Sequence, residues 1–148
     1  MKKIKFCITF FAVATLFVAC EKEQFIQENK LPAVSKTFIE THFPNEEITT
    51  IIKERDGLSI DYTVYLANGF DIDFTKSGDW DNVDGHFLSV PESILDLLPK
   101  PILQHLTTHF QDFSIIEINK KRNGYEISLS NDMDLTFDLN GKFTGIDD

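Results

Sequence analysis

The sequence predicts an α+β protein made by tandem duplication of one unit, a helix followed by an antiparallel meander of strands. Three observations predict this fold. One pattern of residues occurs twice, each copy opens on a Leu-Pro step before an amphipathic helical pattern, and alternating strands with Asn-Gly turns follow. Because a unit this small has little core of its own, we expect the two meanders to join into one continuous antiparallel sheet with the helices on one face.

The repeat itself is the strongest of these signals. At an offset of 67 residues, Leu31-Pro32 matches Leu98-Pro99 and Thr41-His42-Phe43 matches Thr108-His109-Phe110. One gap near Asp56-Gly57 changes the offset to 63. The strand and turn residues then align, with Tyr62, Leu66, Asn68, Asp71, Phe74, Gly78 and Asp84 matching Tyr125, Leu129, Asn131, Asp134, Phe137, Gly141 and Asp147. We therefore expect one domain over residues 31–148, with repeats at residues 31–84 and 90–147.

Each repeat begins with a helix whose start is set by proline, which costs no hydrogen bond in a first turn. In the first helix the predicted inward face is Val34, Phe38, Ile39 and His42, and Pro44 ends the helix after Phe43. The second helix, over residues 101–110, turns an equivalent face inward: Ile102, Leu103, Leu106 and Phe110. A further short helix is expected over residues 91–98. The histidines at the helix ends are expected to pack or cap.

The strands follow in the order of the chain. In the first repeat they are expected over residues 48–55, 60–67, 70–75 and 80–84, and the last strand of the second repeat over residues 143–147. Asn68-Gly69, Asn123-Gly124 and Asn140-Gly141 mark turns, because Asn-Gly suits the positive φ angles of tight hairpins. Trp80, which aligns with Phe143, is expected at the edge of the core.

Residues 1–19 have the pattern of an export signal, with Lys2, Lys3 and Lys5 before an apolar run that is short for a membrane span. The end of this segment, Phe17-Val18-Ala19-Cys20, resembles a bacterial lipoprotein cleavage box, in which the cysteine receives lipid. We therefore expect a signal peptide over residues 1–19, lipidation at Cys20 and a tether over residues 20–30, disordered or weakly helical. An ordinary secretory signal cut near Ala19, or an uncleaved anchor, are the alternatives.

The charge limits the partners. The chain has 24 acidic and 14 basic residues, a net charge of −10, which is a poor match for the basic surface of a nucleic-acid-binding protein, and we expect no nucleic-acid partner. An acidic domain is also repelled by an anionic membrane surface, so we expect contact with the membrane through the lipid anchor alone. A protein or peptide with basic groups is the partner that this charge favours.

Strand alternation divides the sheet into an apolar face and a polar one. Tyr62, Val64, Leu66 and Ile72, with their counterparts in the second repeat, are expected beneath the helices. The opposite face is acidic and has one tyrosine. We predict it as a partner-binding surface through these residues: Tyr65, Asp61, Asp71, Asp73, Glu126, Asp134 and Asp138. The alternative is that this face is only the solvated side of a one-sided sheet.

Catalytic and cofactor motifs are missing from the sequence. It has no G-x-S-x-G, no glycine-rich phosphate loop and no H-E-x-x-H, and its two cysteines both lie in residues 1–20. Asp71, Asp73, Asp79, Asp81 and Asp84 suggest a calcium site, but their spacing is not that of an EF-hand and turn formation accounts for Asp79 and Asp81. We therefore expect a protein that is not an enzyme and that uses no cofactor and no metal ion.

The repeated frame, with Leu31-Pro32, Thr41-His42-Phe43-Pro44 and the stretch from Tyr62 to Phe74, resembles the PepSY-like family of secreted bacterial proteins. The resemblance covers residues 31–147 and implies an architecture similar to the β-lactamase inhibitor protein, with two α/β repeats in one antiparallel sheet. It brings no catalytic residues. By analogy, it implies that the open face of the sheet binds another protein, and related PepSY domains suggest control of secreted peptidases.

The expected function is thus a non-enzymatic lipoprotein of the cell envelope that binds a protein or peptide, for instance as an inhibitor or modulator of a hydrolase. The expected location is the outer membrane, on its periplasmic or its surface side. Two alternatives remain from the sequence: a protein that binds cations or a small ligand, and a structural spacer of the envelope.

Overall fold

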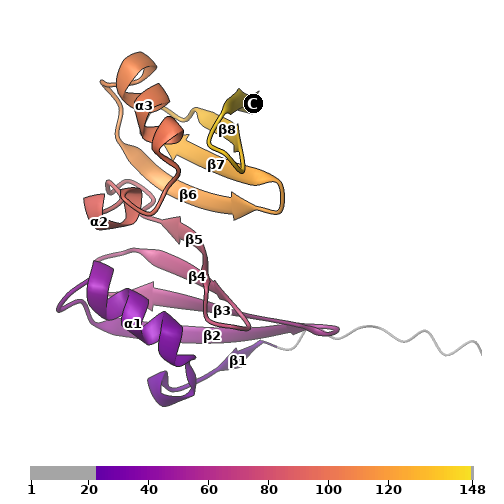
Figure 1. Cartoon of the computed structure of the whole chain (residues 1–148). Coiled ribbons are helices and arrows are strands. Elements are labelled where there is room, and N and C mark those ends of the chain that lie inside the picture. The colour runs from indigo at the N-terminus through magenta and orange to yellow at the C-terminus, as the bar shows by residue number, and fades with distance from the viewer. Residues whose placement is uncertain (1–22, 148) are drawn as a thin grey trace, which may run out of the picture.

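The computed structural model describes residues 23–147, and residues 1–22 and 148 lie outside the described part. It contains nine strands and three α-helices, with one short 3-10 helix near the start (Figure 1). In chain order the elements are β1 (Gln24–Phe25), η1 (Glu28–Lys30), α1 (Ala33–His42), β2 (Ile48–Asp56), β3 (Ser59–Leu66), β4 (Asp71–Thr75), β5 (Trp80–Asp84), α2 (Glu92–Leu95), α3 (Lys100–His109), β6 (Ile115–Lys121), β7 (Gly124–Leu129), β8 (Asp134–Asp138) and β9 (Phe143–Asp147).

The nine strands form one antiparallel sheet, and their order in space is their order in the chain. The helices lie on one side of this sheet, with α1 beside the β2–β4 half and α3 beside the β6–β8 half (Figure 1). The two halves meet where β5 pairs with β6, through Asn82 with Asn119, Val83 with Ile118 and Asp84 with Glu117. The predicted fold class is confirmed, including the continuous sheet.

Both long helices begin and end in the same way. The Leu-Pro steps mark both helix starts, and Pro32 and Pro99 are the N-cap residues, one position before the first turn in which they were predicted. At the other end the N–H of Phe43 donates to Ile39 O at 2.8 Å, and the N–H of Phe110 donates to Leu106 O at the same distance. The two aromatic residues close equivalent helices in the two halves.

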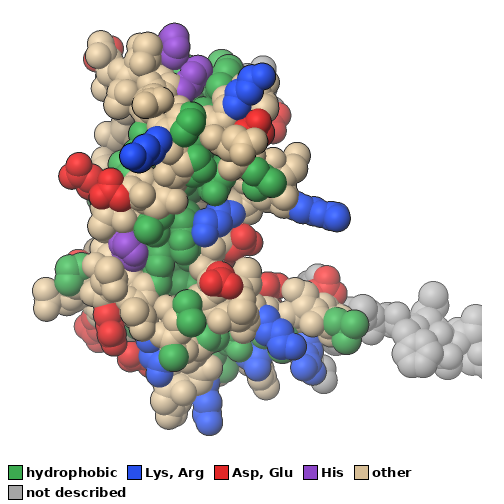
Figure 2. Space-filling view, viewed as in Figure 1, with side chains coloured by type: hydrophobic (Ala, Val, Ile, Leu, Met, Phe, Trp, Pro, Cys, Tyr) green, Lys and Arg blue, Asp and Glu red, His purple; other side chains and the backbone are tan. Residues whose placement is uncertain are grey.

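The core lies between the helices and the face of the sheet that alternation assigns to it. Figure 2 shows hydrophobic side chains in a band down this side of the molecule, between charged and polar side chains. Residues from both halves are fully buried, among them Val64, Ile72, Val83, Ile94, Ile102, Ile118, Ile127 and Leu135. The inward residues predicted from the strands are buried, except Tyr125, which is half-buried at the edge of the core.

The same aromatic cluster occurs in both halves. Phe38 of α1 stacks on Trp80 with ring centroids 5.7 Å apart and meets Phe74 edge-on. At the equivalent positions, His105 of α3 stacks on Phe143 at 4.4 Å and meets Phe137 edge-on. Trp80 is 9% exposed. It is therefore part of the core edge, as predicted, and each last strand is fixed to its helix by aromatic contact.

The structure corrects the predicted inward face of α1. Val34 is 54% exposed, whereas Ser35 is fully buried and its hydroxyl donates to Gly78 O at 3.1 Å. Ser35 occupies the position of Ile102 in the second repeat. A buried serine is stable there because the carbonyl in the turn before β5 satisfies its hydroxyl.

Two further predictions were wrong in detail. Part of the expected tether is folded, because Gln24 and Phe25 pair with Lys53 and Ile52 and add β1 to the edge of the sheet. The β6–β7 turn falls on residues 122–123, and Gly124 begins β7. Glycine is required there by close packing, since a Cβ would lie 1.8 Å from Phe137 O.

The predicted signal peptide and the lipidation site at Cys20 lie outside the described residues. Within residues 23–147, no helix is long and apolar enough to cross a membrane.

The junction of β5 and β6 generates a stability prediction. Ile118 is fully buried beside Val83, its partner across the junction. The Ile118→Ala substitution should lower the free energy of unfolding by about 2–5 kcal/mol, which is the usual cost of a large-to-small change in a packed core. Because the two halves share one sheet, chemical denaturation followed by circular dichroism should still show a single transition.

The matched control is Leu58→Ala, since Leu58 is 98% exposed in the β2–β3 turn. This variant should unfold within about 0.5 kcal/mol of the parent protein. Two separate transitions in Ile118→Ala, one of them at the parent midpoint, would show that the halves are stable independently and would contradict the prediction.

Candidate functional site

The face of the sheet opposite the helices is a candidate binding surface because carboxylates line up across it. One row of directly paired residues crosses the strands from β3 to β9. In order its members are Tyr65, Asp71, Asp84, Glu117, Ser128, Asp134 and Asp147. We call these residues the acidic row. Neighbouring strands in a sheet are about 4.8 Å apart, so carboxylates of adjacent members lie near one another.

The acidic row has a polar neighbour. The residues two positions further along each strand form a second row, in which amides and hydroxyls are more frequent than acids. Its members are Thr63, Asp73, Asn82, Asn119, Glu126, Thr136 and Gly145. Both rows result from period-two alternation, which places every second residue of each strand on the same face.

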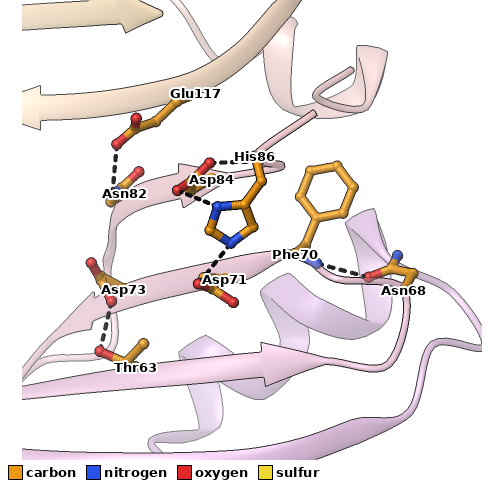
Figure 3. A network of polar contacts seen from close by, with 9 residues as sticks. All are labelled: Thr63, Asn68, Phe70, Asp71, Asp73, Asn82, Asp84, His86 and Glu117. Atoms are coloured by element: carbon orange, nitrogen blue, oxygen red, sulfur yellow. Dashed lines mark hydrogen bonds and ion pairs between the residues drawn. The ribbon is translucent and has the colours of Figure 1, made fainter. Parts of the chain in front are cut away.

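Like charges on directly paired residues destabilise a sheet. Asp71, Asp84 and Glu117 nevertheless follow one another on β4, β5 and β6. The side chain of His86 lies beside the first two of them (Figure 3). Its Nε2 is 3.0 Å from Asp71 Oδ2, and its Nδ1 is 3.2 Å from Asp84 Oδ2. One imidazole thus joins two of the three adjacent carboxylates.

The backbone holds His86 in place. The turn after β5 puts this residue at a φ of 54°, in the left-handed region that is uncommon for residues other than glycine. The N–H of His86 donates to Asp84 Oδ1 at 2.6 Å, and the N–H of Leu88 donates to Gly85 O at 2.8 Å. Asp84 therefore fixes both the backbone and the ring of His86.

Two other carboxylates of this face are held by neutral donors (Figure 3). Asn82 Nδ2 donates to Glu117 Oε1 at 3.0 Å, and the hydroxyl of Thr63 donates to Asp73 Oδ1 at 2.7 Å. Burial raises the pKa of Glu117, and the nearby Asp84 carboxylate adds to this effect. Burial likewise raises the pKa of Asp73, with the hydroxyl of Thr63 acting against it.

Basic residues compensate little of this charge. Within residues 23–147, one ion pair between a lysine or arginine and a carboxylate is formed, from Lys121 Nζ to Glu126 Oε1 at 3.1 Å. The pKa of Tyr65 is raised, first by burial and then by the Asp71 and Asp73 carboxylates. A cation from outside would therefore be favoured on this face.

The structure brings most of the predicted site residues together. Tyr65, Asp71 and Asp134 are in the acidic row, and Asp73 and Glu126 are in the second row.

Asp61 and Asp138 lie on the same face, further along their strands, and both have local partners. Asp61 accepts a hydrogen bond from the hydroxyl of Ser59, and Asp138 Oδ1 accepts the N–H groups of Asn140 and Lys142. Asp138 thus caps the β8–β9 turn. Together with Glu126 and Asp147, it also lines a hollow of about 470 Å³.

Four titratable residues of this face had not been predicted as part of the binding surface: Asp84, His86, Glu117 and Asp147. The acids could have been found by extending the alternation to the first and last strands of each repeat. His86 gives no signal in the sequence, because its place beside Asp71 depends on a turn with an unusual φ. Within residues 23–147, no group of three histidine, cysteine, aspartate or glutamate side chains could hold a metal ion.

A family model described as "Putative beta-lactamase-inhibitor-like, PepSY-like" matches residues 16–62 and 60–145. The chain belongs to the PepSY-like family. The resemblance seen in the sequence is thereby confirmed. No curated protein matches the chain.

Three solved structures have the same fold. One, from Bacteroides thetaiotaomicron and described as a "putative calcium-regulated periplasmic protein", has 32% identity and a TM-score of 0.78, covering 85% of this chain and 97% of its own. A "putative periplasmic protein of unknown function" from Bacteroides vulgatus has 28% identity and a TM-score of 0.80, covering 86% and 100%. A second Bacteroides vulgatus "putative periplasmic protein" has 31% identity and a TM-score of 0.78, covering 85% and 97%.

The raised pKa of Asp73 generates a prediction about stability and pH. In the unfolded chain this carboxyl has its ordinary pKa, so the folded protein binds the proton more tightly and ionised Asp73 opposes folding. Asp73→Asn should therefore raise the melting temperature at pH 7.5. This gain in melting temperature should shrink as the pH falls from above the raised pKa of Asp73 towards the ordinary pKa of an aspartate, near 4, because Asp73 in the parent protein then becomes protonated.

The matched control is Asp112→Asn, which removes one charge from an exposed turn after α3. Its melting temperature should follow that of the parent protein across the same pH range. If Asp73→Asn lowers the melting temperature at pH 7.5, or raises it equally at every pH, burial of the charge is not the cause.

Proposed function

We propose that this protein is a non-enzymatic protein of the cell envelope that binds a basic segment of another protein on the acidic face of its sheet. The observation that carries the proposal is the acidic row, in which carboxylates from both repeats are aligned with few cations beside them. Export is supported by the periplasmic proteins that share its fold. Lipidation at Cys20 is part of the proposal and depends on the sequence pattern alone.

The length of the row suits an extended partner. From Asp71 on β4 to Asp147 on β9 the row crosses five strand spacings, about 24 Å in all. A basic chain laid across the strands would meet carboxylates on β4, β5, β6, β8 and β9 in turn. Charges of this kind favour rapid association and selection of basic partners, and salt weakens both.

A basic partner would also relieve the electrostatic repulsion between neighbouring carboxylates of the row. Asp71, Asp84 and Glu117 repel one another along the row, and only the first two share His86. An arginine or lysine placed between neighbouring carboxylates would relieve this repulsion. Tyr65, half-buried at the β3 end of the row, offers an aromatic ring to the stem of the same side chain.

The family description "beta-lactamase-inhibitor-like" supports binding of a protein in preference to catalysis. Inhibition of a hydrolase is the finer form of the proposal. It requires apolar anchors in addition to charge, because tight inhibitors depend on a few well-packed side chains. Among the face residues, Tyr65 is the clearest such anchor. We therefore propose binding of a basic segment as the general function and hydrolase inhibition as a special case.

The proposal predicts the behaviour of a simple probe. A labelled 12-residue peptide of alternating lysine and threonine should bind, as measured by fluorescence anisotropy at low ionic strength, and its affinity should fall as salt is added. The same peptide with glutamate in place of lysine should not bind. In the triple variant Asp71→Asn/Glu117→Gln/Asp134→Asn, binding should weaken roughly tenfold or more, since each exposed charge pair contributes modestly.

A control variant makes the same charge change on the helix side, with Glu40→Gln/Glu92→Gln/Asp96→Asn. All three of its positions are exposed. It should bind the lysine peptide within about twofold of the parent protein, because only charge distant from the bound peptide has changed. Equal weakening in the two triple variants would mean that net charge, and not this face, attracts the peptide, and the proposal would fail.

Calcium binding is a second candidate function, and one observation favours it. Asp71, Asp84 and Glu117 supply carboxylate oxygens from three adjacent strands, and oxygen ligands of this kind suit Ca²⁺. The relative described as "calcium-regulated" is 32% identical over most of both chains. As they lie among the described residues, these side chains do not form a group that could hold a metal ion, so they would have to rotate to surround one.

Calorimetric titration with CaCl₂ tests this second candidate. If calcium binds at the row, a dissociation constant of about 10⁻⁴–10⁻³ M, the range of extracellular modules, is expected. It should weaken at least tenfold in Asp71→Asn/Asp84→Asn, and MgCl₂ should give a smaller response. A flat trace at millimolar calcium would dispose of the candidate and leave peptide binding untouched.

A further inference from the structure

A second surface, on the helix side of the second repeat, has the chemistry of a docking site. A pocket of about 270 Å³ opens between α2, α3 and the start of β6. We call it the α2–α3 pocket. Its apolar lining includes Leu95, Leu103, Leu106, Phe110, Phe113 and Ile115. Its polar lining, Ser89, Thr107, Gln111 and Ser114, is uncharged.

The first repeat contains the matching pocket, which serves as an internal comparison. The floor of this pocket is apolar in the same way, since Ile39, Phe43 and Ile48 are the counterparts of Leu106, Phe110 and Ile115. The backbone around it is also equivalent. Leu31 N–H donates to Glu28 O at 3.0 Å, and at the offset of 67 Leu98 N–H donates to Leu95 O at 3.0 Å.

The two pockets differ in the residues above this floor. The pocket of the first repeat has Glu28, Lys36 and Glu46 where the α2–α3 pocket has Leu95, Leu103 and Phe113. Glu40 and Glu47 replace Thr107 and Ser114 in the same way. The fold therefore tolerates charged residues at these positions. Because packing does not demand apolar residues there, their presence in the second repeat needs another reason.

Exposed apolar side chains continue outside the pocket. Phe113 on its rim is 41% exposed, Leu97 after α2 is 49% exposed, and Leu88 and Phe87 in the turn before α2 are 44% and 96% exposed. The counterpart of Leu97 in the first repeat is Lys30. An apolar pocket among exposed apolar side chains with a neutral polar rim is the pattern of a protein-binding site.

We propose that the α2–α3 pocket binds an uncharged, apolar segment of a partner protein, with one large aliphatic or aromatic side chain inserted between Leu103 and Phe113. The absence of charge from its lining, against five charged residues in the matching pocket, argues for a partner without charge at this contact. Gln111, Thr107 and Ser114 would bond the partner's backbone. This site is on the helix side and is independent of the acidic row.

Residue-sized probes test the proposal. N-acetylphenylalaninamide and N-acetylleucinamide, titrated into ¹⁵N-labelled protein, should shift the amide signals of Leu103, Phe110 and Phe113. Two control probes of the same size with charged side chains, N-acetylglutamic acid α-amide and N-acetyllysinamide, should leave those signals in place. If the charged probes shift them equally, or the apolar probes shift none, the proposal is overturned.

Variants that exchange the two pockets sharpen the test. Phe113→Glu and Leu103→Lys install the residues of the first repeat and should weaken binding of the apolar probes at least tenfold. Phe113→Glu alone changes a side chain that is already 41% exposed, so loss of folding should not obscure the result. The control variant Leu58→Glu changes an exposed residue in the β2–β3 turn of the first repeat, and it should bind the apolar probes like the parent protein. Retained binding in folded Phe113→Glu would overturn the proposal.

The reverse exchange, Glu28→Leu/Lys36→Leu/Glu46→Phe, should create a second set of shifted signals around Phe43. Failure to create it would show that the differing residues do not determine binding, which also overturns the proposal. Sedimentation separates a partner protein from a second copy of this chain. If the parent protein is a dimer and Phe113→Glu is a monomer, the pocket binds a second copy, and the proposed partner is wrong.

Discussion

The pairing of β5 with β6 is the contact on which the rest of this structure depends. Three pairs form it, and the central one, Val83 with Ile118, is fully buried. It turns two small units, each with a limited core, into one sheet with a shared core. The same register places Asp84 opposite Glu117, so the junction that stabilises the core also makes the acidic row continuous between the repeats.

Duplication gives the molecule two versions of each feature, and the versions have diverged unequally. The core side keeps equivalent contacts although the residues differ: Phe38 stacks on Trp80, and its counterpart His105 stacks on Phe143. The surfaces have changed much more. His86 joins two carboxylates in the first repeat, and the pocket beside the long helix is charged in one repeat and apolar in the other. Packing constrains the residues of the core, whereas only binding to a partner would constrain the residues of these surfaces.

Local rules were sufficient to predict most of the fold from the sequence. Proline fixed the helix starts, alternation separated the two faces of the sheet, and Asn-Gly marked turns at Gly69 and Gly141, whose φ angles are 96° and 80°. Features that depend on distant contacts were not predictable. Ser35 is buried because a turn 43 residues away accepts its hydrogen bond. β1 forms only by pairing with β2, a segment that lies beyond the first helix in the chain. Tyr65, Asp71 and Asp134 were found by alternation alone, but the place of Glu117 beside Asp84 required the junction register.

Native-state hydrogen exchange of the β5 and β6 amides tests the central claim, one sheet across both repeats, most directly. The account predicts that the amides bonded across the junction, such as Gly85 N–H to Ile116 O at 2.8 Å, exchange only with global unfolding, as slowly as those within β3 and β7. If the junction amides exchange by a local opening while β3 and β7 stay protected, the two repeats are separate units and the continuous acidic row has no structural basis.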